Sequence, residues 1–149
     1  MARQSERLKV VLELEQRREQ AALEQFQAAQ ELLRQQTDRL SQLERYQGEY
    51  QDQLRNDGAT GPIPVSRLQT GHAFISQLGQ AIAGQYRQIE KARRDFEQAR
   101  EQWQKAWERR EGMARFIETC RERERREDDR REQKALDEAA SQQFARRRK

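Results

Sequence analysis

The chain has 149 residues, of which 34% are hydrophobic and 38% are charged. Globular domains contain roughly 45–50% apolar residues, so this composition excludes a round core and leaves material for a narrow seam between helices. The net charge of +4, from 30 basic and 26 acidic residues, permits an acidic partner but does not require nucleic acid.

The first predicted helix covers about residues 5–56, and Ser5 is expected to cap it. Its apolar residues recur in alternating steps of four and three, an average of about 3.5, which predicts left-handed supercoiling against a second helix. The repeat consists of Leu8, Leu12, Ala22, Phe26, Ala29, Leu33, Leu40, Leu43, Tyr50 and Leu54. Four positions in the same phase are polar, namely Glu15, Glu19, Gln36 and Gln47.

A strong helix breaker follows at residues 57–66. Gly58 is expected to end the first helix in a left-handed conformation, and both prolines of the chain, Pro62 and Pro64, lie in this stretch. Ser66 is the expected N-cap of the second helix. The sequence therefore predicts a single reversal of direction here.

The second predicted helix covers about residues 67–120 and carries the same repeat. Its members are Leu68, Ile75, Leu78, Ile82, Ile89, Ala92, Phe96, Ala99, Trp103, Ala106, Met113, Ile117 and Cys120, and only Gly71, Gln85 and Arg110 interrupt it. If Leu54 faces Leu68, residue 8 lies near residue 114 and residue 2 near residue 120. We predict an all-α fold: one coiled-coil domain, residues 1–149, whose two long helices form an antiparallel hairpin with an overhanging charged C-terminal helix, residues 121–149.

No feature of the sequence indicates catalysis. His72 and Cys120 are the sole histidine and cysteine, so no metal site of usual spacing is expected, and Cys120 is interpreted as a small buried seam residue. The glycines near Gly58 lack the ending of a phosphate-binding loop. We expect no enzymatic activity, no catalytic residue, no cofactor, no signal peptide and no membrane-spanning segment.

Several apolar residues lie outside the seam, in two groups. The loop-end group consists of Tyr46, Phe74, Ala81 and Tyr86, which flank Leu43, Tyr50 and Leu78; the other group, nearer the chain ends, consists of Val10, Val11, Leu14, Trp107 and Phe116. Such residues either widen the seam locally or contact partners, because grouped exposed aromatic residues mark binding sites. In the predicted register Leu14 and Trp107 are neighbours. Two groups at opposite ends favour two partners.

The residues around the breaker resemble the FliJ family, the small coiled-coil components of bacterial flagellar type III export. The specific part is Leu40-x-x-Leu43-x-x-Tyr46-Gln-Gly-Glu-Tyr50 before the loop, with Phe74-Ile75-x-x-Leu78-x-x-Ala81-Ile82 after it. The resemblance implies an antiparallel two-helix coil, similar to the stalk of rotary ATPases. The end with both termini would enter the export ATPase hexamer and promote its assembly and activity.

The resemblance further implies contact with the cytoplasmic part of the membrane export gate, binding of export chaperones, and a cytoplasmic location at the inner membrane of the flagellar base. The family's gate-binding patch maps onto Leu43, Tyr46, Tyr50, Phe74, Leu78 and Ala81. Arg39 and Gln85 occupy two further patch positions where this chain departs from the family pattern. We assign ATPase-ring binding to Val11, Leu14, Trp107 and Phe116.

Three alternatives remain open at the level of sequence. The first is the related rod of an injectisome secretion system, with the same fold and mechanism. The second is a generic coiled-coil adaptor or oligomer. The third is a nucleic-acid binder that uses the arginine-rich residues 121–131 and 146–149, although acidic residues alternate with arginine in the first stretch, so we expect no nucleic-acid partner.

Overall fold

The computed structural model describes residues 3–148 and has an all-α fold. Helix α1 covers Gln4–Ala59 and helix α2 covers Val65–Arg148, and the two pack against each other. Helix α1 continues three residues beyond its expected end at residue 56. Helix α2 starts two residues early and stays helical through the charged stretch. Residues 129–148 are exposed along their whole length. That these residues overhang the paired region stays a prediction.

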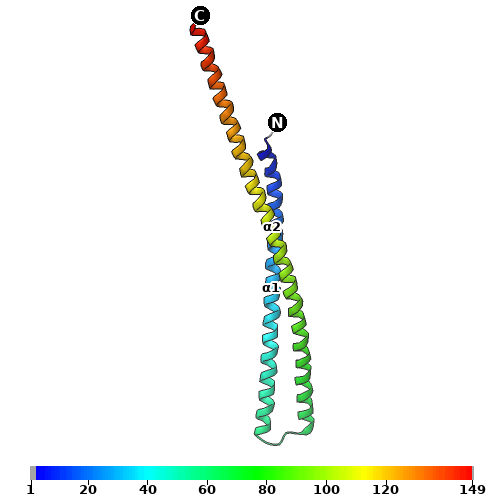
Figure 1. Cartoon of the computed structure of the whole chain (residues 1–149). Helices are drawn as coiled ribbons and strands as arrows, with labels where there is room; N and C mark the ends of the chain where they lie inside the picture. Colours follow the sequence, from blue (N-terminus) through cyan, green and yellow to red (C-terminus); the bar gives the residue numbers. More distant parts are fainter. Residues whose placement is uncertain (1–2, 149) are drawn as a thin grey trace. The chain divides into compact units, whose positions relative to one another are not determined.

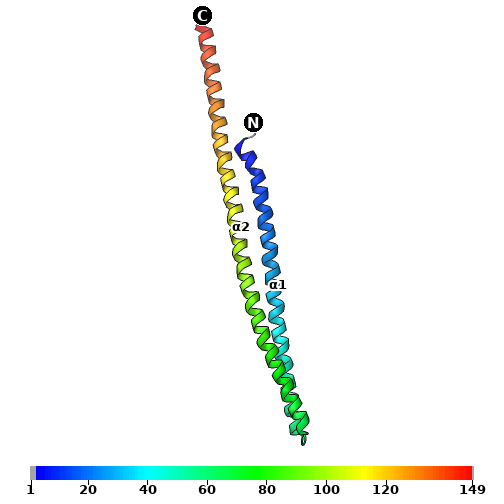
Figure 2. The same cartoon turned by 90° about the vertical axis from the view of Figure 1, so that its right-hand side faces the viewer.

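The contacts divide the chain into two compact units. We call Ala22–Trp103 the loop unit, and Met1–Ala21 with Gln104–Lys149 the terminal unit. In the loop unit, α1 and α2 lie side by side and run in opposite directions from the short connection between them (Figures 1 and 2). In the terminal unit, the start of α1 pairs with α2, where Ser5 bonds to Glu124.

The expected helix caps are wrong. Ser5 lies inside α1, because the amide of Arg7 already donates to the carbonyl of Arg3, and its side chain is buried. At the start of α2, the amides of residues 67 and 68 both donate to the carbonyl of Pro64, so Pro64 holds the place expected for Ser66. Proline suits the start of a helix because its fixed φ is already helical and its missing N–H is not needed there.

The seam of the loop unit follows the predicted phase. Leu78, Ile89 and Ala92 are buried, and the predicted α1 positions from Ala22 to Leu54 are all half-buried. Phe26 packs edge-on against two rings of α2, Phe96 at 5.2 Å and Trp103 at 5.7 Å between centroids. Such edge-to-face pairs add to the free energy gained from apolar burial.

Two polar residues of the seam phase in α1 pair with polar seam residues of α2. In the loop unit the side-chain amide of Gln85 donates to the Gln36 carbonyl at 2.8 Å and to its Oε1 at 2.6 Å. In the terminal unit Arg110 Nε donates to Glu19 Oε2 at 2.6 Å. The other two polar seam residues of α1 are not matched in this way: Gln47 donates to the backbone carbonyl of Ile75, and Glu15 accepts from Arg18 of its own helix.

The register matches the predicted one within the loop unit, where Gln36 bonds to Gln85 and Gln47 to Ile75, each within one residue of the expected partner. It departs from the prediction in the terminal unit, where Glu19 bonds to Arg110. At the loop end Leu54 packs over Gly71: its two δ-carbons lie 3.0 and 3.1 Å from the point where a β-carbon at Gly71 would be. Leu68, one turn earlier in α2, stays 40% exposed. Gly71 thus belongs to the seam, because it leaves room for the side chain of Leu54, and it does not interrupt the packing. Ser5, placed by the predicted register between residues 114 and 120, instead bonds to Glu124, so the pairing extends further along α2.

Candidate partner-binding surfaces

Three aromatic rings gather at one edge of the seam in the loop unit. Phe74 of α2 packs against Tyr50 of α1, with 4.7 Å between ring centroids, and against Tyr46 at 6.1 Å. Both contacts are edge-to-face, at interplanar angles of 61° and 83°. Tyr46 remains 52% exposed even so. We call Tyr46, Tyr50 and Phe74 the ring cluster; it presents aromatic area to solvent in a fixed geometry.

The other three residues of the predicted patch differ in accessibility. Leu78 is 8% exposed and lies one turn after Phe74, so it supports the ring cluster from the seam. Leu43 is half-buried, and Ala81 is exposed. The structure brings Tyr46, Tyr50 and Phe74 together, and helical spacing places Leu43, Leu78 and Ala81 on the same sides of their helices. Tyr46 and Ala81 are the more accessible members.

Two residues that the sequence groups with this patch lie elsewhere. Gln85 is 6% exposed and is engaged with Gln36, so its side chain is not available to a partner. Tyr86 is twelve residues after Phe74, which rotates it about 120° around the helix. Its hydroxyl donates to Glu44 Oε1 at 3.1 Å, and this bond raises the pKa of Tyr86 above its ordinary value. Tyr86 thus lies apart from the ring cluster.

The second predicted group lies in the terminal unit, where Val11, Leu14, Trp107 and Phe116 are all exposed. Trp107 and Phe116 are nine residues apart, which places them on opposite sides of α2. The four residues therefore do not form one continuous surface. The predicted contact between Leu14 and Trp107 stays a prediction.

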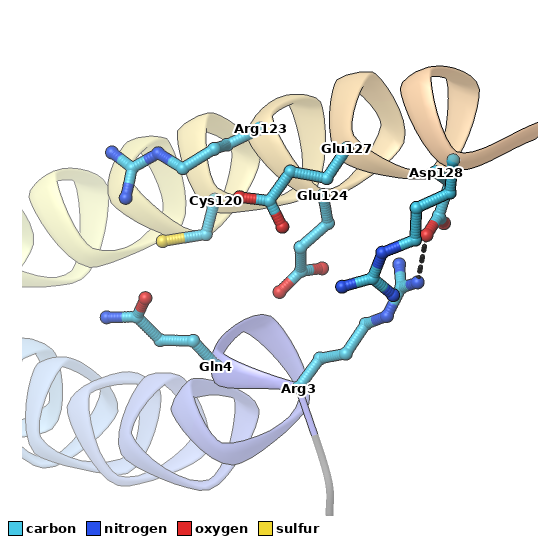
Figure 3. Close-up of a pocket in the computed structure, with 8 residues that line it drawn as sticks. Arg3, Gln4, Cys120, Arg123, Glu124, Glu127 and Asp128 are labelled. Atoms are coloured by element: carbon cyan, nitrogen blue, oxygen red, sulfur yellow. Dashed lines mark hydrogen bonds and ion pairs between the residues drawn. The ribbon is translucent and has the colours of Figure 1, made fainter. Parts of the chain in front are cut away.

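The terminal unit also has a polar hollow of about 420 Å³ between α1 and α2. Figure 3 shows Arg3, the residue before α1, reaching to Asp128, while Cys120 and Glu124 face α1 from α2. The Ser5 amide donates to Glu124 Oε1 at 3.1 Å and its hydroxyl donates to Oε2 at 2.6 Å. We call the pairs Ser5–Glu124 and Arg3–Asp128 the latch.

The latch shifts the titration of both carboxyl groups. The hydrogen bond from the Ser5 hydroxyl holds the pKa of Glu124 below its ordinary value, and the bond from Arg3 does the same to the pKa of Asp128. These groups fasten the first turn of α1 to α2. Sequence reasoning missed the latch, although Glu124 is the next position of the seam phase and could have indicated it.

Cys120 beside the latch is 2% exposed, as expected for a seam residue. In residues 3–148, no three His, Cys, Asp or Glu side chains come together as a metal site would require. Within the same part of the chain, neither helix contains a stretch long and apolar enough to cross a membrane.

The comparisons with known proteins identify one family. The family model described as the flagellar FliJ protein matches residues 4–149, nearly the whole chain. No curated protein and no solved structure matches the chain. FliJ proteins are non-enzymatic components of the flagellar export apparatus. The match confirms the resemblance first found in the residues around the loop: this chain belongs to the FliJ family and is a component of flagellar protein export.

Proposed function

We propose that this chain is a stalk-like component that promotes the flagellar export ATPase ring and links it to the membrane export gate. The observation that carries the proposal is the ring cluster of the loop unit, an exposed aromatic surface separate in sequence from the apolar residues of the terminal unit. The chain also binds export chaperones in this proposal, without residues assigned to them. It acts in the cytoplasm, at the inner membrane of the flagellar base.

The gate contact is assigned to Leu43, Tyr46, Tyr50, Phe74, Leu78 and Ala81. Aromatic residues supply most of the free energy of binding in protein interfaces because they bury large areas at a small entropic cost. Packing against Tyr50 and Tyr46 already restricts the Phe74 ring, so little side-chain entropy remains to be lost on binding.

The ATPase contact is assigned to the terminal unit. Val11, Leu14, Trp107 and Phe116 expose apolar side chains on several sides of their helices, which suits insertion into a ring that surrounds them. In this proposal the exposed residues 129–148 overhang the paired region and enter the ring with them.

The decisive experiment is binding of the purified chain to the cytoplasmic domain of the export gate and, separately, to the hexameric ATPase. Tyr46→Ala with Phe74→Ala is expected to abolish gate binding and to leave helicity and stimulation of ATP hydrolysis unchanged. Tyr86→Ala is the matched control, because it removes an exposed tyrosine from the same unit outside the ring cluster. Unchanged gate binding by the double variant disproves the patch assignment.

A further inference from the structure

The loop unit leaves apolar side chains uncovered on the edge of the seam away from the ring cluster. Because Leu54 seats over Gly71, the side chain of Leu68 has no partner in the seam position that its phase predicts and is 40% exposed. Ile63 of the connection and Ile75 of α2 lie beside it, and with Leu54 and Leu68 they line a hollow of about 460 Å³.

This hollow is separate from the ring cluster. Leu68, His72 and Ile75 follow one another at steps of four and three and so share one side of α2. Phe74 lies on the other side of the seam, since His72 is rotated by about 160° from it. None of the three rings of the cluster lines the hollow.

The polar side chains that line the hollow are all hydrogen-bond donors, and none is a carboxylate. Gln51, Arg55 and His72 complete the lining with Gly58. Arg55 has one ion pair, to Asp52 at 3.8 Å, and both side chains are more than two-thirds exposed. Such an exposed pair is weak, so the Arg55 guanidinium can exchange it for another carboxylate.

We propose that this hollow is a second docking site, which takes a bulky apolar side chain flanked by carboxylates on a partner protein. The apolar side chain rests on Leu54, Ile63, Leu68 and Ile75, and removes their exposed area from water. The neighbouring carboxylates pair with Arg55 and accept hydrogen bonds from Gln51 and His72. Charge complementarity selects an acidic segment over a basic one.

Methyl NMR on the full chain tests the site, because its five isoleucines report on different places. Ile63 and Ile75 line the hollow, whereas Ile82, Ile89 and Ile117 do not. The probes are two acetylated peptide amides, Glu-Phe-Glu and Lys-Phe-Lys. The acidic peptide is expected to shift the Ile63 and Ile75 methyl signals alone, and the basic peptide is expected to bind more weakly. Arg55→Gln is expected to weaken binding of the acidic peptide about threefold to fivefold, as for one exposed charge pair.

The controls separate this site from the ring cluster and from self-association. Leu68→Gln changes an exposed side chain, so it is expected to preserve helicity while it abolishes the shifts; Tyr46→Ala is expected to leave them unchanged. Equal shifts from both peptides, shifts at all five isoleucines, or no shift at millimolar peptide overturn the proposal. A dimer that Leu68→Gln converts to a monomer also overturns it, since a second copy of the chain then fills the hollow.

Discussion

The two units join α1 to α2 with the same seam but with different polar contacts. In the seam of the loop unit the polar pair is neutral, Gln36 with Gln85, while the ion pair Asp57–Arg67 of this unit lies beside the connection. In the terminal unit the pairs are charged, Glu19 with Arg110 and then the latch at the first turn of α1. Charged pairs respond to salt and acid, whereas an amide pair does not. The seam of the terminal unit therefore depends on solution conditions more than the seam of the loop unit does.

The difference between the polar pairs of the two units matters for the proposed function, because each unit is assigned to a different partner. The unit assigned to the gate presents a ring cluster whose geometry is fixed by neutral packing. The unit assigned to the ATPase ring keeps its helices together through contacts that a charged partner is able to replace. The following substitutions test whether the two kinds of pair behave differently.

Removal of Arg110 is expected to have the largest effect. In Arg110→Leu the carboxylate of Glu19, whose side chain is 19% exposed, loses its charged hydrogen-bond partner in the seam. The loss of such a bond costs about 2 kcal/mol of the free energy of unfolding. Urea unfolding measured by circular dichroism gives the change, and Glu19→Leu in the same chain is expected to recover most of it, because an apolar pair then fills the space. A double variant no more stable than Arg110→Leu contradicts the pairing.

Removal of the amide pair is expected to have a smaller effect of a different kind. Gln85→Leu leaves Gln36 without its partner and is expected to cost about 1 kcal/mol. Gln36→Leu with Gln85→Leu is expected to be at least as stable as the natural chain, but less specific in register, since a polar pair in a seam selects one alignment.

Spin labels at residues 30 and 93, both exposed and both in the loop unit, measure that specificity. The double leucine variant is expected to broaden the distribution of distances between the labels, whereas the natural chain gives one narrow distribution. A narrow distribution in both proteins shows that packing around Phe26 fixes the register without the glutamines.

The sequence predicts which residues face the seam and how the two helices align in the loop unit, but not how they align in the terminal unit. Burial follows the repeat at every predicted seam position except Leu68, and even Glu15 and Gln47 are half-buried as their phase requires. The local alignment also depends on small residues in the seam. Gly71 makes room for the side chain of Leu54 because glycine has no β-carbon, whereas the apolar repeat counts Gly71 only as an interruption. Matching of apolar residues therefore paired Leu54 with Leu68, which lies one turn before Gly71 in α2.

For the candidate sites, the sequence pattern reveals the residues beside the seam of the loop unit but misses the charged contacts of the terminal unit. Tyr46, Tyr50 and Phe74 come together because spacing places each beside the seam, which the pattern reveals. The burial of Gln85 follows from its place in the seam phase, and the predicted register places its partner Gln36 within one residue of it. The charged stretch after Cys120 has no apolar phase, so the pattern ended there while Glu124 continued the pairing through a carboxylate.

Acid is expected to release the latch, the smallest of these effects. The pKa values of Glu124 and Asp128 lie below their ordinary values of 4.5 and 3.8, so the folded state favours both carboxylates in their charged form. Their contribution is complete above the ordinary values and is lost as the pH falls through the lower values of the folded state. Amide hydrogen exchange, corrected for the intrinsic effect of pH, is expected to show lower protection of the first turns of α1 at pH about 3 than at pH about 6.

The backbone amides around Gln36 serve as an internal reference for this measurement, because the helices are joined there by the uncharged pair Gln36–Gln85. Their protection is expected to be the same at both pH values. Ser5→Ala removes the hydroxyl that lowers the pKa of Glu124, so it is expected to reduce protection already at the higher pH and to weaken the response to acid. If the loop unit loses protection as much as the first turns of α1, acid acts on the whole coil, and the contrast between neutral and charged pairing is wrong.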